Sequence, residues 1–412
     1  MTDATRRRCK GLSLIAVLSA FSGITVIKTP AQAATLNVPA QYAGIQQAID
    51  ASADGDTVLI APGTYPGQIN FRGKAITVTS SGGPTNTAID SMGAGNVVVF
   101  DSGETQSSEI SGLTLQNGAA NYGAGIIVIG ASPHIVGNIF HSNVEGVGGS
   151  GAGIGGEGSP LIEKNLFYSN SCSANDNLSG VISLNNGSQP IIVNNVFRDN
   201  VSCAAVNVTV QDGFSQEITN NTMVGNMIGI YVDSRTGMQH QLLRNNIIVG
   251  NQIGIEDEFS DSIGRPDCES NLVYNNGTNY QGMPDQTGAN GNISSDPMFV
   301  NQAQKNFHLT AGSPAIDSGN ENSTPPLPTE DFDSILRPID GNGNGDGVAR
   351  IDIGAFEFNP AVSNLPLPTA QSSSGGGGGL LDPVAVVFLF SLFCVGQAAG
   401  KGWRHREVRD DG

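Results

Sequence analysis

Basic residues are scarce in this sequence, and almost half of them lie at its two ends. Nine of the 19 Lys and Arg fall within residues 1–33 and 401–412, so residues 34–379 hold ten Lys and Arg against 32 Asp and Glu. A body this acidic repels phosphate backbones, which disfavours nucleic-acid binding. Hydrophobic residues make up 38% of the chain, enough for a packed core, so global disorder is disfavoured as well.

The two ends have the composition of export and membrane signals. Residues 1–33 combine a basic cluster, an apolar run and the small-residue site Ala31-Gln32-Ala33, which is typical of a secretory signal peptide. An uncleaved signal anchor is the alternative. Residues 361–379 form a Pro/Ser/Gly linker, residues 380–400 an apolar stretch just long enough to span a bilayer, and residues 401–412 a basic tip expected in the cytoplasm.

A repeat of the form Asn-x-Φ-x-x-Asn, where Φ is a large apolar residue, fills the middle of the chain. Its six copies begin at Asn138, Asn165, Asn195, Asn221, Asn246 and Asn271. The short apolar/polar alternation in each copy predicts strands of three to five residues, and one such unit cannot bury its apolar face alone. Stacking the copies creates a continuous core, with Asn at the sharp corners and stacked Asn side chains hydrogen-bonded along the axis. The leucine-rich frame expected of the main rival repeat is absent.

These features resemble the right-handed parallel β-helix of the pectin-lyase-like superfamily. The N-terminal order supports the resemblance: residues 45–52 fit a short amphipathic helix, followed by GDTVLIAPGTY from Gly55 and GKAITVTS from Gly73. The expected fold class is therefore all-β, a single-stranded right-handed parallel β-helix over residues 34–299 with an N-terminal capping helix. The helix would cover an end of the solenoid that otherwise invites edge pairing.

The C-terminal third resembles surface-anchoring modules. SPAID from Ser313, Arg337-Pro338 and DIGAFE from Asp352 are similar to the choice-of-anchor Q domain, which places a closing module at residues 300–360. The Gly run, apolar helix and basic tip that follow resemble the GlyGly-CTERM sorting tails of bacterial surface proteins. That resemblance implies export machinery, cleavage by a rhomboid-type sorting protease, and localisation at the bacterial cell envelope. A plain membrane anchor remains the alternative.

The motif DGNGNGDG, from Asp340 to Gly347, is the strongest local candidate for a metal site. Oxygen-bearing side chains alternate with glycine, a pattern that suits Ca²⁺. An EF-hand would need Glu at the twelfth position, where this chain has Ile351. We therefore expect a structural Ca²⁺ site, with an unliganded Gly-rich turn as the alternative. Its candidate ligands are Asp340, Asn342, Asn344, Asp346 and Asp352.

The residue after each Φ is expected to point outward, because strand side chains alternate. This places His141, Tyr168 and Arg198 side by side on consecutive coils, with Glu163 and Asp199 near them in sequence. Such a row can contact a sugar or uronate, with Glu163 and Asp199 as ligand-binding residues. It can also support proton abstraction, with Arg198 or Tyr168 as the base and His141 as the acid. The alternative is an ordinary solvated face.

The cysteines fit an exported protein. Cys172 and Cys203 follow the closing Asn of neighbouring repeats, so they can face each other, and both a disulfide and two separate thiols remain open. Cys268 takes a core position held elsewhere by Ile or Leu and is expected to be an inert buried thiol. No Cys/His set has zinc spacing.

Signatures of the superfamily's enzymes are missing. The sequence has no Gly-His-Gly with a downstream Arg-Ile-Lys, no Asp-Pro-His-Glu, and no paired Asp-Asp on a coil. The sequence therefore favours a surface-displayed, non-enzymatic protein that contacts glycans or acts as an adhesive or structural rod. A polysaccharide lyase or glycoside hydrolase acting on acidic polysaccharide at the envelope is the alternative.

Overall fold

The computed structural model describes residues 32–173, 179–185, 187–211, 216–236, 241–258, 264–321, 328–341, 348–359 and 367–370. The signal segment up to residue 31, the linker residues 371–379, the apolar stretch 380–400 and the basic tip lie outside these ranges. Within them, no helix is both long enough and apolar enough to cross a membrane.

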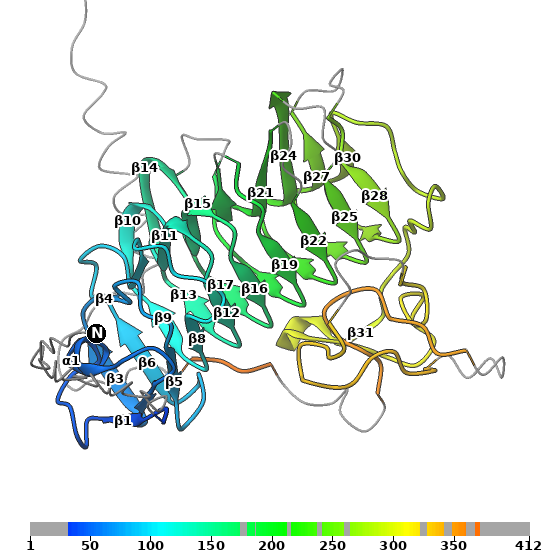
Figure 1. Cartoon of the computed structure of the whole chain (residues 1–412). Coiled ribbons are helices and arrows are strands. Elements are labelled where there is room, and N and C mark those ends of the chain that lie inside the picture. The colour runs from blue at the N-terminus through cyan, green and yellow to red at the C-terminus, as the bar shows by residue number, and fades with distance from the viewer. Residues whose placement is uncertain are drawn as a thin grey trace, which may run out of the picture. The chain divides into compact units, whose positions relative to one another are not determined.

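Short strands follow one another coil by coil and pair in parallel with the equivalent strand of the next coil (Figure 1). They form three long parallel sheets in the described part of the chain, here named A, B and C. Sheet A contains β1 (Thr35–Val38), β2 (Thr57–Ile60), β5 (Thr77–Ser80), β8 (Glu109–Ser111), β12 (His134–Val136), β16 (Leu161–Glu163), β19 (Ile191–Val193), β22 (Glu217–Thr219), β25 (Leu242–Arg244) and β28 (Asp267–Glu269). The fold is a parallel β-helix, as the repeat predicts.

The other two sheets complete each coil. Sheet B contains β3 (Gly63–Pro66), β6 (Thr87–Asp90), β9 (Thr114–Gln116), β13 (Ile139–His141), β17 (Leu166–Tyr168), β20 (Val196–Arg198), β23 (Thr222–Val224), β26 (Ile247–Val249) and β29 (Leu272–Tyr274). Sheet C contains β4 (Ile69–Asn70), β7 (Val98–Phe100), β11 (Ile126–Ala131), β15 (Ile154–Gly158), β18 (Gly180–Leu184), β21 (Ala204–Gln211), β24 (Ile228–Thr236), β27 (Ile253–Asp257) and β30 (Thr278–Gln281).

The helix α1 (Ile45–Ala51) lies at the N-terminal end of the solenoid, where the sequence predicts a cap. It buries Ile45, Ala48 and Ile49 in the same core that the coils share. The Φ residues supply the sheet B side of this core. Phe140, Phe167 and Phe197 stack along it, with ring centroids 4.5 and 4.7 Å apart.

Two ladders of buried Asn side chains run along the corners of the coils. The first Asn of each repeat stands between sheets A and B, and the second stands between sheets B and C. Asn165, for example, accepts a hydrogen bond on Oδ1 from the backbone N–H of Asn138 (2.9 Å) and donates from Nδ2 to Oδ1 of Asn195 (3.1 Å). The predicted ladder is thus present, and it satisfies polar groups that have no access to water.

The left-handed corner residues are not the repeat Asn residues themselves, contrary to expectation. The positive φ angles fall on the residue just before each, such as Lys164 (55°), Asn194 (54°), Asn220 (54°) and Asn245 (54°). The repeat Asn is needed for its side-chain amide, whereas the preceding residue makes the turn.

The closing segment covers the outer face of sheet B. Its first elements are β31 (Phe299–Asn301), the short 3₁₀ turn η1 (Gln302–Gln304) and β32 (Asn306–Leu309). Phe307 and Phe356 of this segment, together with Leu367 from the stretch predicted as a linker, pack on Ile139, Leu166 and Val196. These three strand residues stand beside the Φ residues and point away from the core. A second cluster packs Leu309, Ile353 and Phe358 on Ile247 and Leu272. The apolar outer face of sheet B is therefore an internal interface.

Candidate functional site

The structure brings His141, Tyr168 and Arg198 together as the repeat predicts. They pair in register at the ends of β13, β17 and β20. The His141 and Tyr168 rings stack, with centroids 5.2 Å apart and planes 5° from parallel. The guanidinium carbon of Arg198 lies 4.1 Å from the Tyr168 ring centre. The three side chains form one continuous stack, which fixes their rotamers.

The polar atoms of this row are engaged inside the protein. The His141 ring contacts Gln116 at 2.8 Å and Ser142 at 2.9 Å. Burial lowers the pKa of His141 to about 4, with the positive charge of Arg198 adding to the effect against the opposing carboxylate of Asp90. A neutral imidazole at pH 7 has one acceptor nitrogen, and here both ring nitrogens already have partners.

Asp199 lies beside the row and anchors it to the closing segment. It pairs with Arg198 at 3.2 Å and with Lys305 at 2.8 Å. The Tyr168 hydroxyl accepts a hydrogen bond from the backbone N–H of Ala370 at 3.1 Å. The row therefore lies at the margin of the interface between sheet B and the closing segment, and Arg198 is only 8% exposed.

Glu163, the other candidate ligand-binding residue, is not part of this row. It stands on sheet A, where its carboxylate lies 2.9 Å from Nε2 of His134, while Glu109 lies 3.2 Å from Nδ1. Burial opposes a charge on His134, but the hydrogen bonds to Glu109 and Glu163 outweigh it and raise the pKa of the ring to about 9. This carboxylate–histidine–carboxylate set links three consecutive coils.

The proposed Ca²⁺ ligands lie only partly within the described residues. Asn342, Asn344 and Asp346 fall outside them, and no group of three His, Cys, Asp or Glu suited to a metal ion occurs among the residues that are described. Asp352 has an internal role: its carboxylate accepts hydrogen bonds from the backbone N–H of Asp317 (2.7 Å) and of Phe358 (2.6 Å). The Ca²⁺ site stays a prediction.

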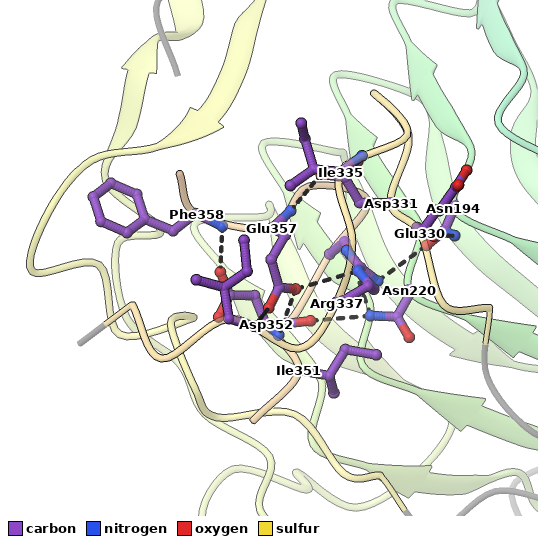
Figure 2. Close-up of polar contacts among 12 residues, drawn as sticks. Asn194, Asn220, Glu330, Asp331, Ile335, Arg337, Ile351, Asp352, Glu357 and Phe358 are labelled. Atoms are coloured by element: carbon purple, nitrogen blue, oxygen red, sulfur yellow. Dashed lines mark hydrogen bonds and ion pairs between the residues drawn. The ribbon is translucent and has the colours of Figure 1, made fainter. Parts of the chain in front are cut away.

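Asp352 belongs to a buried ionic cluster that organises the closing segment. Figure 2 shows Arg337 beside the Glu357 carboxylate, at 3.2 Å, with Asp331 and Asp352 around them. The carboxylates accept backbone N–H groups from a segment with little regular structure, among them that of Glu357 onto Asp331 (2.8 Å). Burial raises the pKa of Asp331, Asp352 and Glu357, and neighbouring carboxylates add to the rise. The positive charge of Arg337 opposes it without cancelling it.

The same cluster is joined to the corner column of the solenoid. Arg337 donates to the side chain of Asn194 (3.1 Å), and Asn220 donates to the backbone carbonyl of Asp352 (3.0 Å), as Figure 2 shows. Lys164, one coil before Asn194, pairs with Glu330 at 2.7 Å. The motifs at residues 337–338 and 352–357 therefore fasten the closing segment to the solenoid.

A polar groove of about 480 Å³ lies on the outer face of sheet C. Glu157 on β15, Thr209 on β21 and Asp233 on β24 meet there, together with Asn185, which directly follows β18. It is lined by Tyr122, Gly148, Gly149, Ser150, Gly156, Glu157, Asn185, Asn207, Thr209 and Asp233. The strands β15, β18, β21 and β24 pair in parallel, so the groove crosses the coils along the solenoid axis.

The wall of this groove is a small additional sheet of β10 (Ala119–Tyr122) and β14 (Val144–Ser150). It lies close to sheet C because Gly155 has no side chain: a Cβ there would be 2.2 Å from the carbonyl oxygen of Ser150. Inside the groove, Ser150 bonds to Ser183 (2.6 Å), Asn185 donates to Ser150 (3.2 Å) and Thr209 donates to Asn185 (3.2 Å).

Sequence reasoning did not find this groove. The sequence signal for it is the Gly-rich run from residue 145 to 158. This run lies in the repeat that begins at Asn138, which is 27 residues long. The next repeat has 30 residues, and the later ones have only 25 or 26. Additional Gly-rich residues at a coil corner indicate where a small second sheet, here β10 and β14, can pack on the solenoid.

Cys172 and Cys203 form a disulfide between adjacent coils, with Cα atoms 5.2 Å apart. Cys268 is a free, buried thiol, and burial raises its pKa to about 12.

A second cleft, of about 590 Å³, lies where sheets A and B meet the closing segment. Its charged lining residues, Lys164 and Asp333, are paired with Glu330 and His308. It is therefore a gap along the internal interface.

Comparison with known proteins places the solenoid among β-helices. Residues 74–253 match the family model described as "Right handed beta helix region". No curated protein matches the chain. Among solved structures, it is similar to the pectate lyase Pel9A, with 17% identity, coverage of 76% of this chain and 90% of that chain, and a TM-score of 0.39.

It is also similar to a mutant of AlyGC, a PL6 family alginate lyase, with 14% identity and a TM-score of 0.24. That match covers 68% of this chain and 55% of the alginate lyase. The family match and the stacked coils agree on the fold, a right-handed parallel β-helix.

Proposed function

We propose that this protein is an exported, surface-anchored β-helix that binds polysaccharide without cleaving it. The observation that supports this most directly is the groove on sheet C, where hydroxyl, amide and carboxylate side chains from four coils face one open surface. These are the groups that exchange hydrogen bonds with sugar hydroxyls. A groove that crosses coils suits a linear polymer, which meets a new side chain at each coil.

The internal engagement of the His141 row supports the non-enzymatic role. A general acid or base needs a proton donor or acceptor that is free to reach the substrate. Both ring nitrogens of His141 have partners, and Arg198 is held between Tyr168 and Asp199. A polysaccharide lyase or glycoside hydrolase is the second candidate, favoured by the proximity of a histidine, a tyrosine and an arginine in one row.

Surface display rests on the sequence signals at the two ends. A cleaved signal peptide would deliver residues 34 onward outside the cytoplasm, and the sorting tail or a plain membrane anchor would hold them at the envelope. The Cys172–Cys203 disulfide fits an oxidising compartment of this kind. Structural Ca²⁺ at the Asp340 loop is part of this proposal.

The test is to incubate the full-length protein, with added Ca²⁺, with a panel of neutral and acidic polysaccharides. Unsaturated-product absorbance and new reducing ends report cleavage, and co-sedimentation with insoluble polysaccharide reports binding. We expect binding without product. Product from any polysaccharide would overturn the non-enzymatic role and make His141→Ala, Tyr168→Ala and Arg198→Ala the first variants to compare.

A further inference from the structure

We propose that residues 367–370 form a strap that covers Tyr168 and detaches while the solenoid stays folded. Access of any ligand to the row formed by His141, Tyr168 and Arg198 then depends on the segment that leads to the C-terminal tail. This device lies on sheet B, away from the groove on sheet C, and goes beyond the binding of polysaccharide in that groove.

The hydroxyl edge is the part of Tyr168 that its neighbours in the row leave open. One face of the ring is covered by the guanidinium group of Arg198, whose central carbon lies 4.1 Å from the ring centre. The other face is covered by the ring of His141, with 5.2 Å between the two centroids. A ligand of the row therefore reaches Tyr168 at the edge of the ring that carries the hydroxyl group.

The strap occupies this edge. The backbone N–H of Ala370 donates a hydrogen bond to the Tyr168 hydroxyl oxygen, at a distance of 3.1 Å. Three residues earlier, Leu367 is 7% exposed and packs with Ile139 and Leu166 on the outer face of sheet B. The strap is thus fastened at both of its ends, by an apolar side chain at the first and by a hydrogen bond at the last.

The composition of the strap suits a short segment that docks with few contacts. Pro368 has no backbone N–H, so it needs no hydrogen-bond acceptor, and it lines the cleft between the solenoid and the closing segment. Its ring also biases the preceding Leu367 towards an extended backbone. Because proline has little conformational freedom to lose, ordering the strap over Tyr168 costs less than ordering most segments of this length.

The strap is held more weakly than the closing segment beside it. Among the residues that the structure describes, the strap makes a single hydrogen bond to the rest of the protein. The closing segment is held by the buried ion pair between Arg337 and Glu357 and by hydrogen bonds with two corner Asn residues of the solenoid. Segments with few buried contacts open at a lower free-energy cost than the units on which they lie. The strap therefore opens first.

The experiment measures the reactivity of Tyr168 in the full-length protein, by nitration with tetranitromethane and peptide mass spectrometry. Tyr122, which is 52% exposed, is the internal reference for an open ring, and Tyr231, which is 3% exposed, is the reference for a covered one. We expect Tyr168 to react more slowly than Tyr122. Leu367→Asp places a charge among apolar side chains, which detaches the strap, and is expected to raise the rate at Tyr168 by on the order of tenfold.

Amide hydrogen exchange follows the strap itself. Tyr168→Phe removes the acceptor of the Ala370 N–H and keeps the aromatic ring in the row, so exchange in residues 367–370 is expected to become several-fold faster. Leu336→Asp is the matched control for Leu367→Asp, because Leu336 is a leucine of the closing segment that is 68% exposed, and it should change neither measurement. A thermal melt of each variant establishes that it folds.

The two measurements give clear outcomes. Slow nitration of Tyr168 that Leu367→Asp accelerates, with strap amides exchanging before those of the closing segment, is the result that the proposal predicts. Nitration of Tyr168 as fast as that of Tyr122 in the unmodified protein would overturn it, and so would an unchanged rate in folded Leu367→Asp. Strap amides that exchange no faster than those of the closing segment would show that the strap does not detach by itself.

Discussion

The guanidinium group of Arg198 lies over the ring of Tyr168, with 4.1 Å between its central carbon and the ring centre. The opposite neighbour of Tyr168 is His141, whose ring stacks on it almost in parallel. The three side chains that looked catalytic in the sequence are thus packed against one another.

Replacing Arg198 tests whether this row is structural. Arg198→Ala is expected to lower the free energy of unfolding by about 1–2 kcal/mol, because it removes a cation–π contact and the pairing with Asp199. Urea denaturation measures the loss, and polysaccharide binding should not change. Unaltered stability together with a lost catalytic turnover would show that the row is an active site.

The His134 set predicts a defined pH dependence. The pKa of His134 is raised from 6.5 to about 9 in the folded protein, so the native state binds the proton more tightly than the unfolded chain. The resulting stabilisation is complete below pH 6.5 and is lost as the pH rises through 9. Thermal melts between pH 6 and 10 should show a decline that is weaker in His134→Gln. An equal decline in both proteins would refute the assignment.

The Asn ladders predict large effects from small changes. In Asn195→Ala, the backbone N–H of Asn165 loses its acceptor at 2.9 Å and the carbonyl of Ile162 loses a donor at 2.9 Å. Buried polar groups left without partners cost about 1–3 kcal/mol each. Chemical denaturation should show this loss, whereas Gln252→Ala, at an exposed solenoid residue, should stay within about 0.5 kcal/mol.

Arg337 is expected to be essential for the docking of the closing segment. Arg337→Met leaves the Glu357 carboxylate buried without its cation, and breaking a buried pair in this way costs about 3–5 kcal/mol. Hydrogen exchange should then show protection lost first in residues 328–341 and 348–358, with the coils retaining theirs. Uniform loss of protection across coils and closing segment would contradict a local role.

The cysteines give a chemical test. Peptide mapping without reduction should recover Cys172 linked to Cys203. Cys268 should react with iodoacetamide only after unfolding, since it is 2% exposed and its pKa is raised to about 12. Alkylation of Cys268 in the native protein would show that the last coil opens.

The fold could be predicted from the sequence because its determinants are local and repeated. Six Asn-x-Φ-x-x-Asn units in phase specify the strand, the corner and the inward residue of the coils from residue 138 onward, and the register of His141 with Tyr168 follows from them. Residues at equivalent positions of successive repeats become neighbours in space once the coils stack.

The groove and the coverage of sheet B depend on contacts that no period reveals. Leu166 and Val196 look like ordinary strand residues, yet they face outward and are buried because a segment more than 100 residues later packs on them. The sequence gives no role to Asn194 and Asn220, which precede the repeat Asn residues. In the structure, both form hydrogen bonds with the closing segment. Glu163 is close to Tyr168 in sequence, but a coil corner separates them, so Glu163 lies on sheet A and Tyr168 on sheet B.

The closing segment holds several coils at once, from Lys164 through Asn194 and Asn220 to Asn245, which bonds to Asn320. A solenoid whose coils touch only their neighbours can fray from an end, one coil at a time. Because the closing segment is bonded to four successive coils, each of them can detach only by also breaking its own bond to this segment. A mechanical force applied at the C-terminal side would then be distributed over these four coils and would not unfold the last coil alone.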